Sequence, residues 1–211
     1  MAIKYVIFDV GGVCYPYSLN KLDDWALEHC CNREEFIAKG GVKSFDYNPY
    51  MRGEVDFSKF SKELCEYAGI SYYKEIENEI DEKLHEGVGD FFPQTLECMD
   101  KIKQKGIKVG WLSNALACLC DTADSLVDKD LCFVSYELKC LKPNREIYEK
   151  LIEKLKCKPE EILFIDDKEK NVMGAIDLGI NGIVYKKETI VKDVNRFLNF
   201  DNLKLFKDFQ R

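Results

Sequence analysis

The sequence lacks the residue patterns of a zinc-binding or disulfide-rich protein. It has ten cysteines but no CxxC pair. Its one CxC segment is Cys118-Leu119-Cys120, and the whole chain contains only two histidines that could complete a zinc ligand set with it. Structural zinc needs paired, spaced ligands, so we expect no zinc site. Most cysteines fall on apolar positions of expected helices and strands, where a free thiol packs as a small apolar side chain. This usage, without an export signal, predicts a cytoplasmic protein.

An excess of positive charge and long apolar runs are also missing. The net charge of −7 and the isoelectric point near 5.1 argue against a partner with a phosphate backbone, so we expect no nucleic acid. Met1–Lys4 lead into a strand too short for a signal peptide or a membrane span. The 211 residues, 46% of them hydrophobic, suffice for one large domain or a core with a smaller second domain.

Short apolar strands alternate with helices over most of the chain. Strands are expected at 5–8, 107–112, 132–135, 162–165 and 182–185. Helices are expected between the later strands, at about 93–105, 115–126, 147–155 and 170–178. Strands joined by helices of this length predict an α/β fold, a Rossmann-like parallel sheet covered on both faces.

The segment from 18 to 88 departs from this alternation. Helical spacing places Phe57, Phe60 and Leu64 on one face, and strand signals are scarce. We expect a small helical second domain there, joined to the sheet through a Gly-rich, hinge-like linker at 87–90.

Polar residues follow four of the predicted strands. Asp9 ends the first strand, and the turn at Gly11 and Gly12 lets the backbone approach a ligand closely. The other strand ends contribute Ser113, Asn114, Lys142, Asp166 and Asp167. Because the carboxyl ends of parallel strands share one edge of a sheet, we expect these groups to meet in one cleft.

The chemistry of this set favours phosphoryl transfer. Asp9, Asp166 and Asp167 would repel one another unless a cation lies among them, and a hard ion such as Mg²⁺ suits oxygen ligands. Lys142 adds a fixed positive charge, while hydroxyl and amide donors after the second strand can hold phosphate oxygens. A carboxylate nucleophile beside such groups fits transfer of a phosphoryl group.

Four segments occur in the order of the motifs of the haloacid dehalogenase-like (HAD) hydrolase superfamily: FDVGGV, LSNA, LKPNREIY and FIDDKEKNVMGAIDLGI. The chain resembles that superfamily over nearly its whole length, and specifically its C1-capped subfamily I. Residues 15–88 stand in the place of the helical C1-type cap, and 1–14 with 89–211 in the place of the Rossmann-like core. The Asp-x-Gly-Gly start resembles the branch that contains α-D-glucose-1-phosphate phosphatases.

The resemblance implies a nucleophile and a metal site. Asp9 would attack phosphorus and form an aspartyl-phosphate. The Asp9 carboxylate, the Gly11 carbonyl and Asp166 would bind Mg²⁺, and Asp167 would bind it directly or through a water.

It also implies a binding site for the phosphoryl group of a small phosphorylated metabolite. Ser113 and Asn114 would hold the transferred group, beside the turn at Gly11 and Gly12. Lys142 would neutralise charge on both the nucleophile and the phosphoryl oxygens.

Position 11 departs from the superfamily pattern. Most of its phosphatases carry a second aspartate two residues after the nucleophile, which protonates the leaving oxygen, whereas this chain has Gly11. General acid–base help is worth about 10²–10⁴ in rate. We therefore expect a preference for activated esters such as sugar 1-phosphates. Glu54 could replace the acid, or it could be a solvated glutamate at a helix start.

Three functions remain open from the sequence. The first is a Mg²⁺-dependent phosphatase, the second a non-catalytic binding or regulatory protein that keeps the fold, and the third a metal-independent 2-haloacid dehalogenase. Tyr15 and Tyr17 could stack on a substrate or pack at the hinge, and Arg52 could bind an anion or pair with a carboxylate. A monomer and a homodimer are both compatible with the sequence.

Overall fold

The computed structural model describes residues 2–122 and 126–198. Its centre is a five-stranded, fully parallel sheet with the strand order β3-β2-β1-β4-β5. The strands are β1 (Tyr5–Phe8), β2 (Lys108–Ser113), β3 (Cys132–Val134), β4 (Ile162–Asp166) and β5 (Asn181–Val184). The predicted Rossmann-like α/β fold is confirmed, and each strand begins and ends within one residue of its expected bounds.

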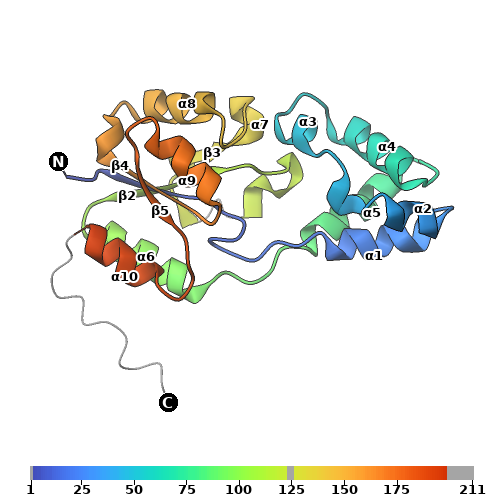
Figure 1. The fold of residues 1–211 in the computed structure, drawn as a ribbon, viewed down its shortest axis with the longest axis horizontal. Helices are drawn as coiled ribbons and strands as arrows, with labels where there is room; N and C mark the ends of the chain where they lie inside the picture. Colours follow the sequence, from blue (N-terminus) through green and yellow to red (C-terminus); the bar gives the residue numbers. More distant parts are fainter. Residues whose placement is uncertain (1, 123–125, 199–211) are drawn as a thin grey trace, which may run out of the picture.

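Helices cover both faces of the sheet (Figure 1). On one face lie α6 (Pro93–Gln104) and α10 (Ile190–Phe197); on the other lie α7 (Ser135–Leu138), α8 (Arg145–Leu155) and α9 (Glu169–Ile176). Neighbouring residues of one strand serve opposite faces, since Phe8 packs with α6 and α10 whereas Ile7 packs with α8 and α9. This double burial explains why β1 and β4 are apolar at nearly every position.

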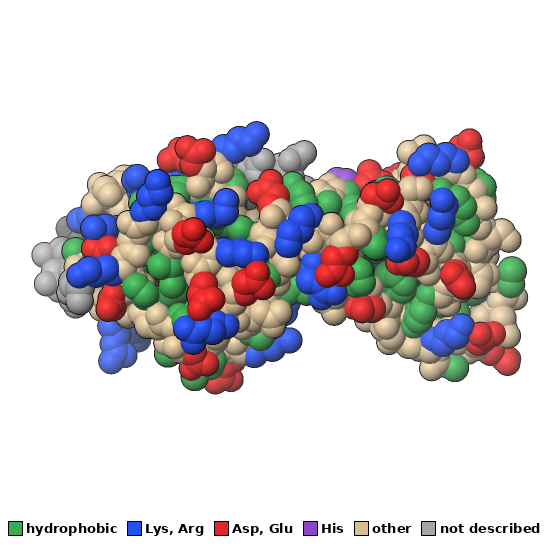
Figure 2. All heavy atoms as spheres, turned by 90° about the horizontal axis from the view of Figure 1, so that it is seen from above, with side chains coloured by type: hydrophobic (Ala, Val, Ile, Leu, Met, Phe, Trp, Pro, Cys, Tyr) green, Lys and Arg blue, Asp and Glu red, His purple; other side chains and the backbone are tan. Residues whose placement is uncertain are grey.

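A group of helices lies to one side of the sheet, and we call it the helical insert. It contains α1 (Asn20–His29), α2 (Arg33–Ala38), η1 (Val42–Ser44), α3 (Asn48–Met51), α4 (Phe57–Ala68) and α5 (Ile76–His85). Asp56 caps α4 through the Lys59 amide, and Gly69 ends it in a left-handed conformation. The insert is filled by a hydrophobic cluster distinct from those beside the sheet, and Leu116 and Leu119 join this cluster from the sheet-containing part. Figure 2 shows a narrowing between the insert and the sheet-containing part.

One predicted helix has a different form. The helix expected at about 115–126 is instead a 3₁₀ segment, η2 (Ala117–Thr122), and residues 123–125 lie outside the described ranges. The physical reason is tertiary, because Leu116 and Leu119 pack into the hydrophobic core of the insert rather than onto the sheet. Within the described ranges, 3₁₀ segments also occur at η4 (Lys129–Leu131) and η5 (Pro159–Glu161).

Hydrogen bonds also join the insert to the sheet-containing part. The Ser135 hydroxyl donates to the Met51 carbonyl at 2.7 Å and accepts from the Ala115 amide at 3.2 Å. The Lys139 ammonium donates to the Gly53 carbonyl at 3.0 Å. The end of α3 is thus held against the start of α7.

Candidate active site

The strand ends bring the predicted polar residues together at one cavity of about 690 Å³. Because β1 lies between β2 and β4, residues that follow these three strands share the same edge of the sheet. The predicted residues that line this cavity, which we call the catalytic cavity, are Asp9, Gly11, Gly12, Ser113, Asn114, Lys142 and Asp167. Asp166, fully buried, lies behind it.

Lys142 is the centre of the charge arrangement. Its ammonium lies 2.8 Å from Asp9 Oδ1 and 2.6 Å from Asp166 Oδ2, and it also donates to the Leu112 carbonyl at 2.7 Å. The lysine side chain is 1% exposed, and those of the two aspartates are 7% and 0% exposed. Exposed ion pairs contribute little, whereas this one is shielded from water. The lysine therefore holds the two carboxylates in fixed positions.

Asn114 and Asn171 position these charged groups. The Asn114 side chain accepts from the Lys142 amide at 2.8 Å and donates to the Lys142 carbonyl at 2.9 Å. Its amide group therefore holds the loop that carries the lysine. Asn171 donates to both Asp166 oxygens at 2.9 Å. Sequence reasoning assigned no role to Asn171; its place in the first turns of the helix after the two acids is the signal that points to it.

The three acids form a cluster that suits a hard cation. Asp9, Asp166 and Asp167 offer carboxylate oxygens that all lie within 4.8 Å of one another. Burial raises the pKa of Asp9, with Lys142 opposing and Asp166 adding to the rise. Burial followed by the charge of Asp9 likewise raises the pKa of Asp167. The three carboxylates thus lie around the Lys142 ammonium, with Lys168 and Lys170 also lining the cavity. Carboxylate oxygens are the ligands that Mg²⁺ prefers.

The glycine turn fits closely around the cluster. Gly12 has φ +87°, and a Cβ there would lie 2.7 Å from Asp167 Oδ2. The left-handed backbone favours glycine at this position, and a Cβ there would have to displace the Asp167 carboxylate. Gly11 differs, because a Cβ there would meet only Tyr17 Cβ, at 3.7 Å.

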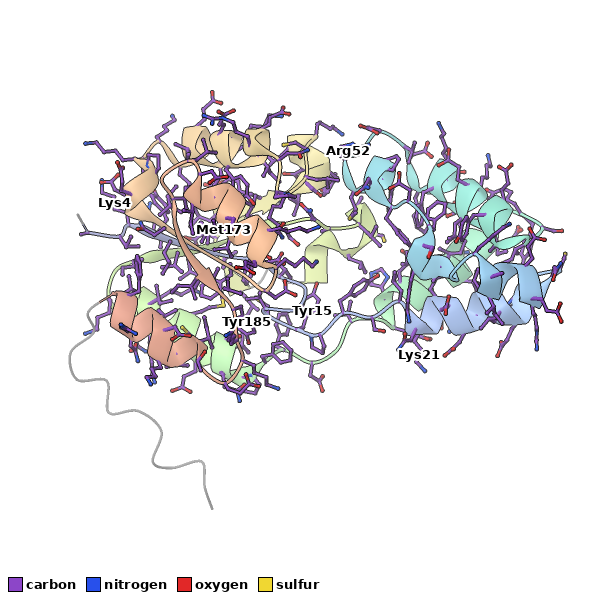
Figure 3. The ribbon with its side chains drawn as sticks, viewed as in Figure 1. Lys4, Tyr15, Lys21, Arg52, Met173 and Tyr185 are labelled. Carbon is purple, nitrogen blue, oxygen red and sulfur yellow. The ribbon has the colours of Figure 1, made fainter. Side chains whose placement is uncertain are left out.

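The sequence suggested two charged residues and two tyrosines at or near the insert as substrate contacts or as a replacement acid. Arg52 and Glu54 pair with each other, with nitrogen–oxygen distances of 2.6 and 3.0 Å, and neither lines a described cavity at the site. Tyr15 is buried and packs edge-on against Phe91, with ring centres 5.4 Å apart. Figure 3 shows Tyr15 where the chain crosses toward the insert, and Arg52 on the insert. Tyr15 and Tyr17 both line a smaller cavity beside the site, and Tyr17 also lines the catalytic cavity.

Comparison with known proteins adds a family and a set of similar folds. The family "haloacid dehalogenase-like hydrolase" matches residues 3–179. A HAD family enzyme from Bacteroides thetaiotaomicron, crystallised with magnesium and inorganic phosphate, has a TM-score of 0.69 at 24% identity, over 88% of this chain and 96% of that one. A predicted HAD-like hydrolase from Porphyromonas gingivalis has a TM-score of 0.75 at 22% identity, over 94% and 98%.

Two curated relatives are longer proteins. Acyl-CoA dehydrogenase family member 10 of Mus musculus is 28% identical over 209 residues, which cover 93% of this chain and 19% of the relative. The (S)-2-haloacid dehalogenase 4A of Burkholderia cepacia is 26% identical over 139 residues, 63% of this chain and 60% of the relative. The chain thus spans about a fifth and three fifths of these relatives. Among the described helices, none is long and apolar enough to cross a membrane.

Proposed function

This chain belongs to the haloacid dehalogenase-like hydrolase family, and we propose that it is a Mg²⁺-dependent phosphatase of small phosphorylated metabolites. The observation that carries the proposal is the buried set of Asp9, Lys142 and Asp166, with Asp167 beside it at the cavity. A similar fold crystallised with magnesium and inorganic phosphate supports it.

In the proposed reaction Asp9 is the nucleophile. Its carboxylate attacks phosphorus, the bond to the leaving oxygen breaks, and an aspartyl-phosphate forms. Lys142 and Ser113 bind the phosphoryl oxygens where negative charge gathers. Water then attacks the phosphorus, which releases inorganic phosphate and restores Asp9. Mg²⁺, held by Asp9, Asp166, the Gly11 carbonyl and Asp167, would supply further charge neutralisation at the same oxygens.

We further propose that the helical insert is a C1-type cap. In this division residues 1–14 and 89–211 form the core domain and residues 15–88 form the cap. The separate hydrophobic core of the insert, and the place of Tyr17 and Met51 at the catalytic cavity, support it.

Gly11 is the basis for a proposed preference among phosphate esters. With no acid at this position, esters whose leaving group departs without a proton should react best. Sugar 1-phosphates are the first class to test, since the start of the chain resembles the glucose-1-phosphate phosphatase branch. Location in the cytoplasm and the choice between monomer and homodimer stay predictions.

A screen of phosphorylated metabolites with added Mg²⁺ tests the reaction. Phosphate release should be lost in Asp9→Asn, which keeps the side-chain shape, and retained in the matched control Asp24→Asn on the exposed surface of α1. No turnover of any phosphate ester would favour a binding or regulatory protein. Release of halide from a 2-haloacid in the presence of EDTA would favour a dehalogenase, the activity named for one curated relative.

A further inference from the structure

A second cavity of about 250 Å³ adjoins the catalytic cavity, and we call it the apolar chamber. Its characteristic lining residues are Tyr17, Leu19, Tyr47, Met51, Leu116 and Leu119. They come from the start of the insert, from α3 and the residue before it, and from η2 and the residue before it. The chamber therefore exists only because the insert and the sheet-containing part lie against each other.

The chamber is continuous with the catalytic cavity. Gly11, Tyr17, Met51 and Ser113 line both. Because a Cβ at position 11 would meet only Tyr17 Cβ, at 3.7 Å, the missing side chain leaves the connection open. A group bonded to a phosphoryl group at Asp9 can extend past Gly11 into this space.

The lining offers few free hydrogen-bonding groups and, among the described residues, no charged side chain. Its polar side chains are Ser113 and Asn114, at the end shared with the catalytic cavity, and the tyrosines at 15, 17 and 47. The Tyr47 hydroxyl is already used, since it donates to the Val42 carbonyl at 3.0 Å. The Tyr17 hydroxyl is buried and has no hydrogen-bond partner among the described residues. A ligand carrying several hydroxyl groups would lose its hydrogen bonds to water there without replacing them.

The volume suits one ring. An apolar cavity of about 150 Å³ accommodates benzene, and the apolar chamber, at about 250 Å³, exceeds that size. A single six-membered ring with a short substituent matches the space, and the unpartnered Tyr17 hydroxyl can satisfy one polar atom on it.

We infer that the apolar chamber binds the leaving group of the substrate, and that this group is an uncharged apolar ring, as in an aryl phosphate. The inference rests on the proposed phosphatase function, and among its activated esters it favours aryl phosphates over the sugar 1-phosphates considered above. A bond forms between an Asp9 oxygen and phosphorus while the bond from phosphorus to the aryl oxygen breaks. The aryloxide leaves with the electron pair and takes a proton from water, so no acid at position 11 is needed. Water then attacks phosphorus, the phosphorus bond to Asp9 breaks, and inorganic phosphate and a proton are released.

Three substrates test the chamber through kcat/KM. We expect phenyl phosphate to exceed α-D-glucose 1-phosphate by about tenfold or more. Acetyl phosphate, an activated acyl phosphate too small to fill the chamber, reports on the catalytic groups alone. Leu19→Ser makes the chamber polar at a half-buried residue directly before α1, outside the helix itself, so the fold should be kept. It should lower kcat/KM for phenyl phosphate about tenfold and leave acetyl phosphate within about twofold.

Leu27→Ser is the matched control, since this leucine is half-buried on the same helix and lies outside both cavities. It should leave the ratios among the three substrates unchanged. Equal or better use of α-D-glucose 1-phosphate by the unmodified protein would overturn the inference. So would an equal loss for all three substrates in Leu19→Ser.

Binding separates the failure of this inference from failure of the proposed reaction. Phenylphosphonate and methylphosphonate cannot be hydrolysed by loss of an alcohol, and calorimetry with Mg²⁺ measures their affinity directly. Phenylphosphonate should bind about tenfold more tightly, and Leu19→Ser should remove the difference. If phenylphosphonate binds more tightly in this way but no phosphate ester is hydrolysed, the proposed phosphatase activity is refuted and the proposed role of the apolar chamber in binding is supported. Equal affinities would refute the chamber even if phosphate esters are hydrolysed.

Discussion

Replacing Lys142 with methionine would remove the cation from a cluster of buried acids. The ammonium lies 2.8 Å from Asp9 and 2.6 Å from Asp166, and the three side chains are 1%, 7% and 0% exposed. Methionine fills a similar volume but leaves two carboxylates facing each other without compensation. Loss of one partner from a buried pair costs about 3–5 kcal/mol. Each kcal/mol lowers Tm by about 2–4 °C in a chain of this size, so the expected decrease is about 6–20 °C.

Thermal unfolding in EDTA is the assay, because bound Mg²⁺ would replace part of the lost charge. With excess Mg²⁺ the decrease in Tm should be smaller. Lys59→Met is the control, since this lysine is 62% exposed and pairs with Glu63 on the surface at 3.8 Å. Such a pair is worth about 0–1 kcal/mol. A Tm for Lys142→Met in EDTA equal to that of the control would refute the electrostatic role of Lys142.

Four further outcomes follow from the site and its support. Gly11→Asp should raise kcat/KM for alkyl phosphates relative to phenyl phosphate by at least about tenfold, because a general acid is restored where a side chain fits; an unchanged ratio would count against the argument. Gly12→Ala should lower stability by about 1–3 kcal/mol and weaken the Mg²⁺ dependence measured by titration, since its Cβ would displace Asp167. Thr95→Val should cost about 1–3 kcal/mol in denaturant unfolding, because the buried Thr95 hydroxyl bonds to Tyr185 at 2.9 Å. Excess EDTA should abolish phosphate release, and added Mg²⁺ should restore it; activity that survives EDTA would contradict the metal requirement.

The fold could be predicted from the sequence because each strand is marked by a short run of consecutive apolar residues. The run before Asp166 is apolar at every position and ends in two acids, which specifies a buried parallel strand and its functional end at once. The same locality explains why the meeting of Asp9, Lys142 and Asp166 could be expected, since parallel topology places strand ends together.

The features that the sequence did not predict depend on contacts between distant segments. The prediction of a helix at 115–126 was wrong because Leu116 packs into the insert. The helix propensity of the residues around Leu116 does not reveal this contact with a distant segment. The apolar chamber needs Tyr47 and Leu119 on opposite sides of one space, and nothing in either segment indicates the other. The polar residues proposed to carry the reaction can therefore be found in the sequence, since each lies at a strand end. The cavity proposed for the leaving group cannot, since it forms only when the insert packs against the sheet-containing part.

The position of Leu116 and Leu119 also bears on how the molecule unfolds. Both belong to the sheet-containing part in sequence but complete the hydrophobic core of the insert, and Ser135 ties the end of α3 to the same region. Separation of the two parts would expose these leucines to water on one side and leave a hole on the other. We therefore expect the stabilities of the insert and the sheet-containing part to be coupled, so that heating melts both in a single cooperative transition.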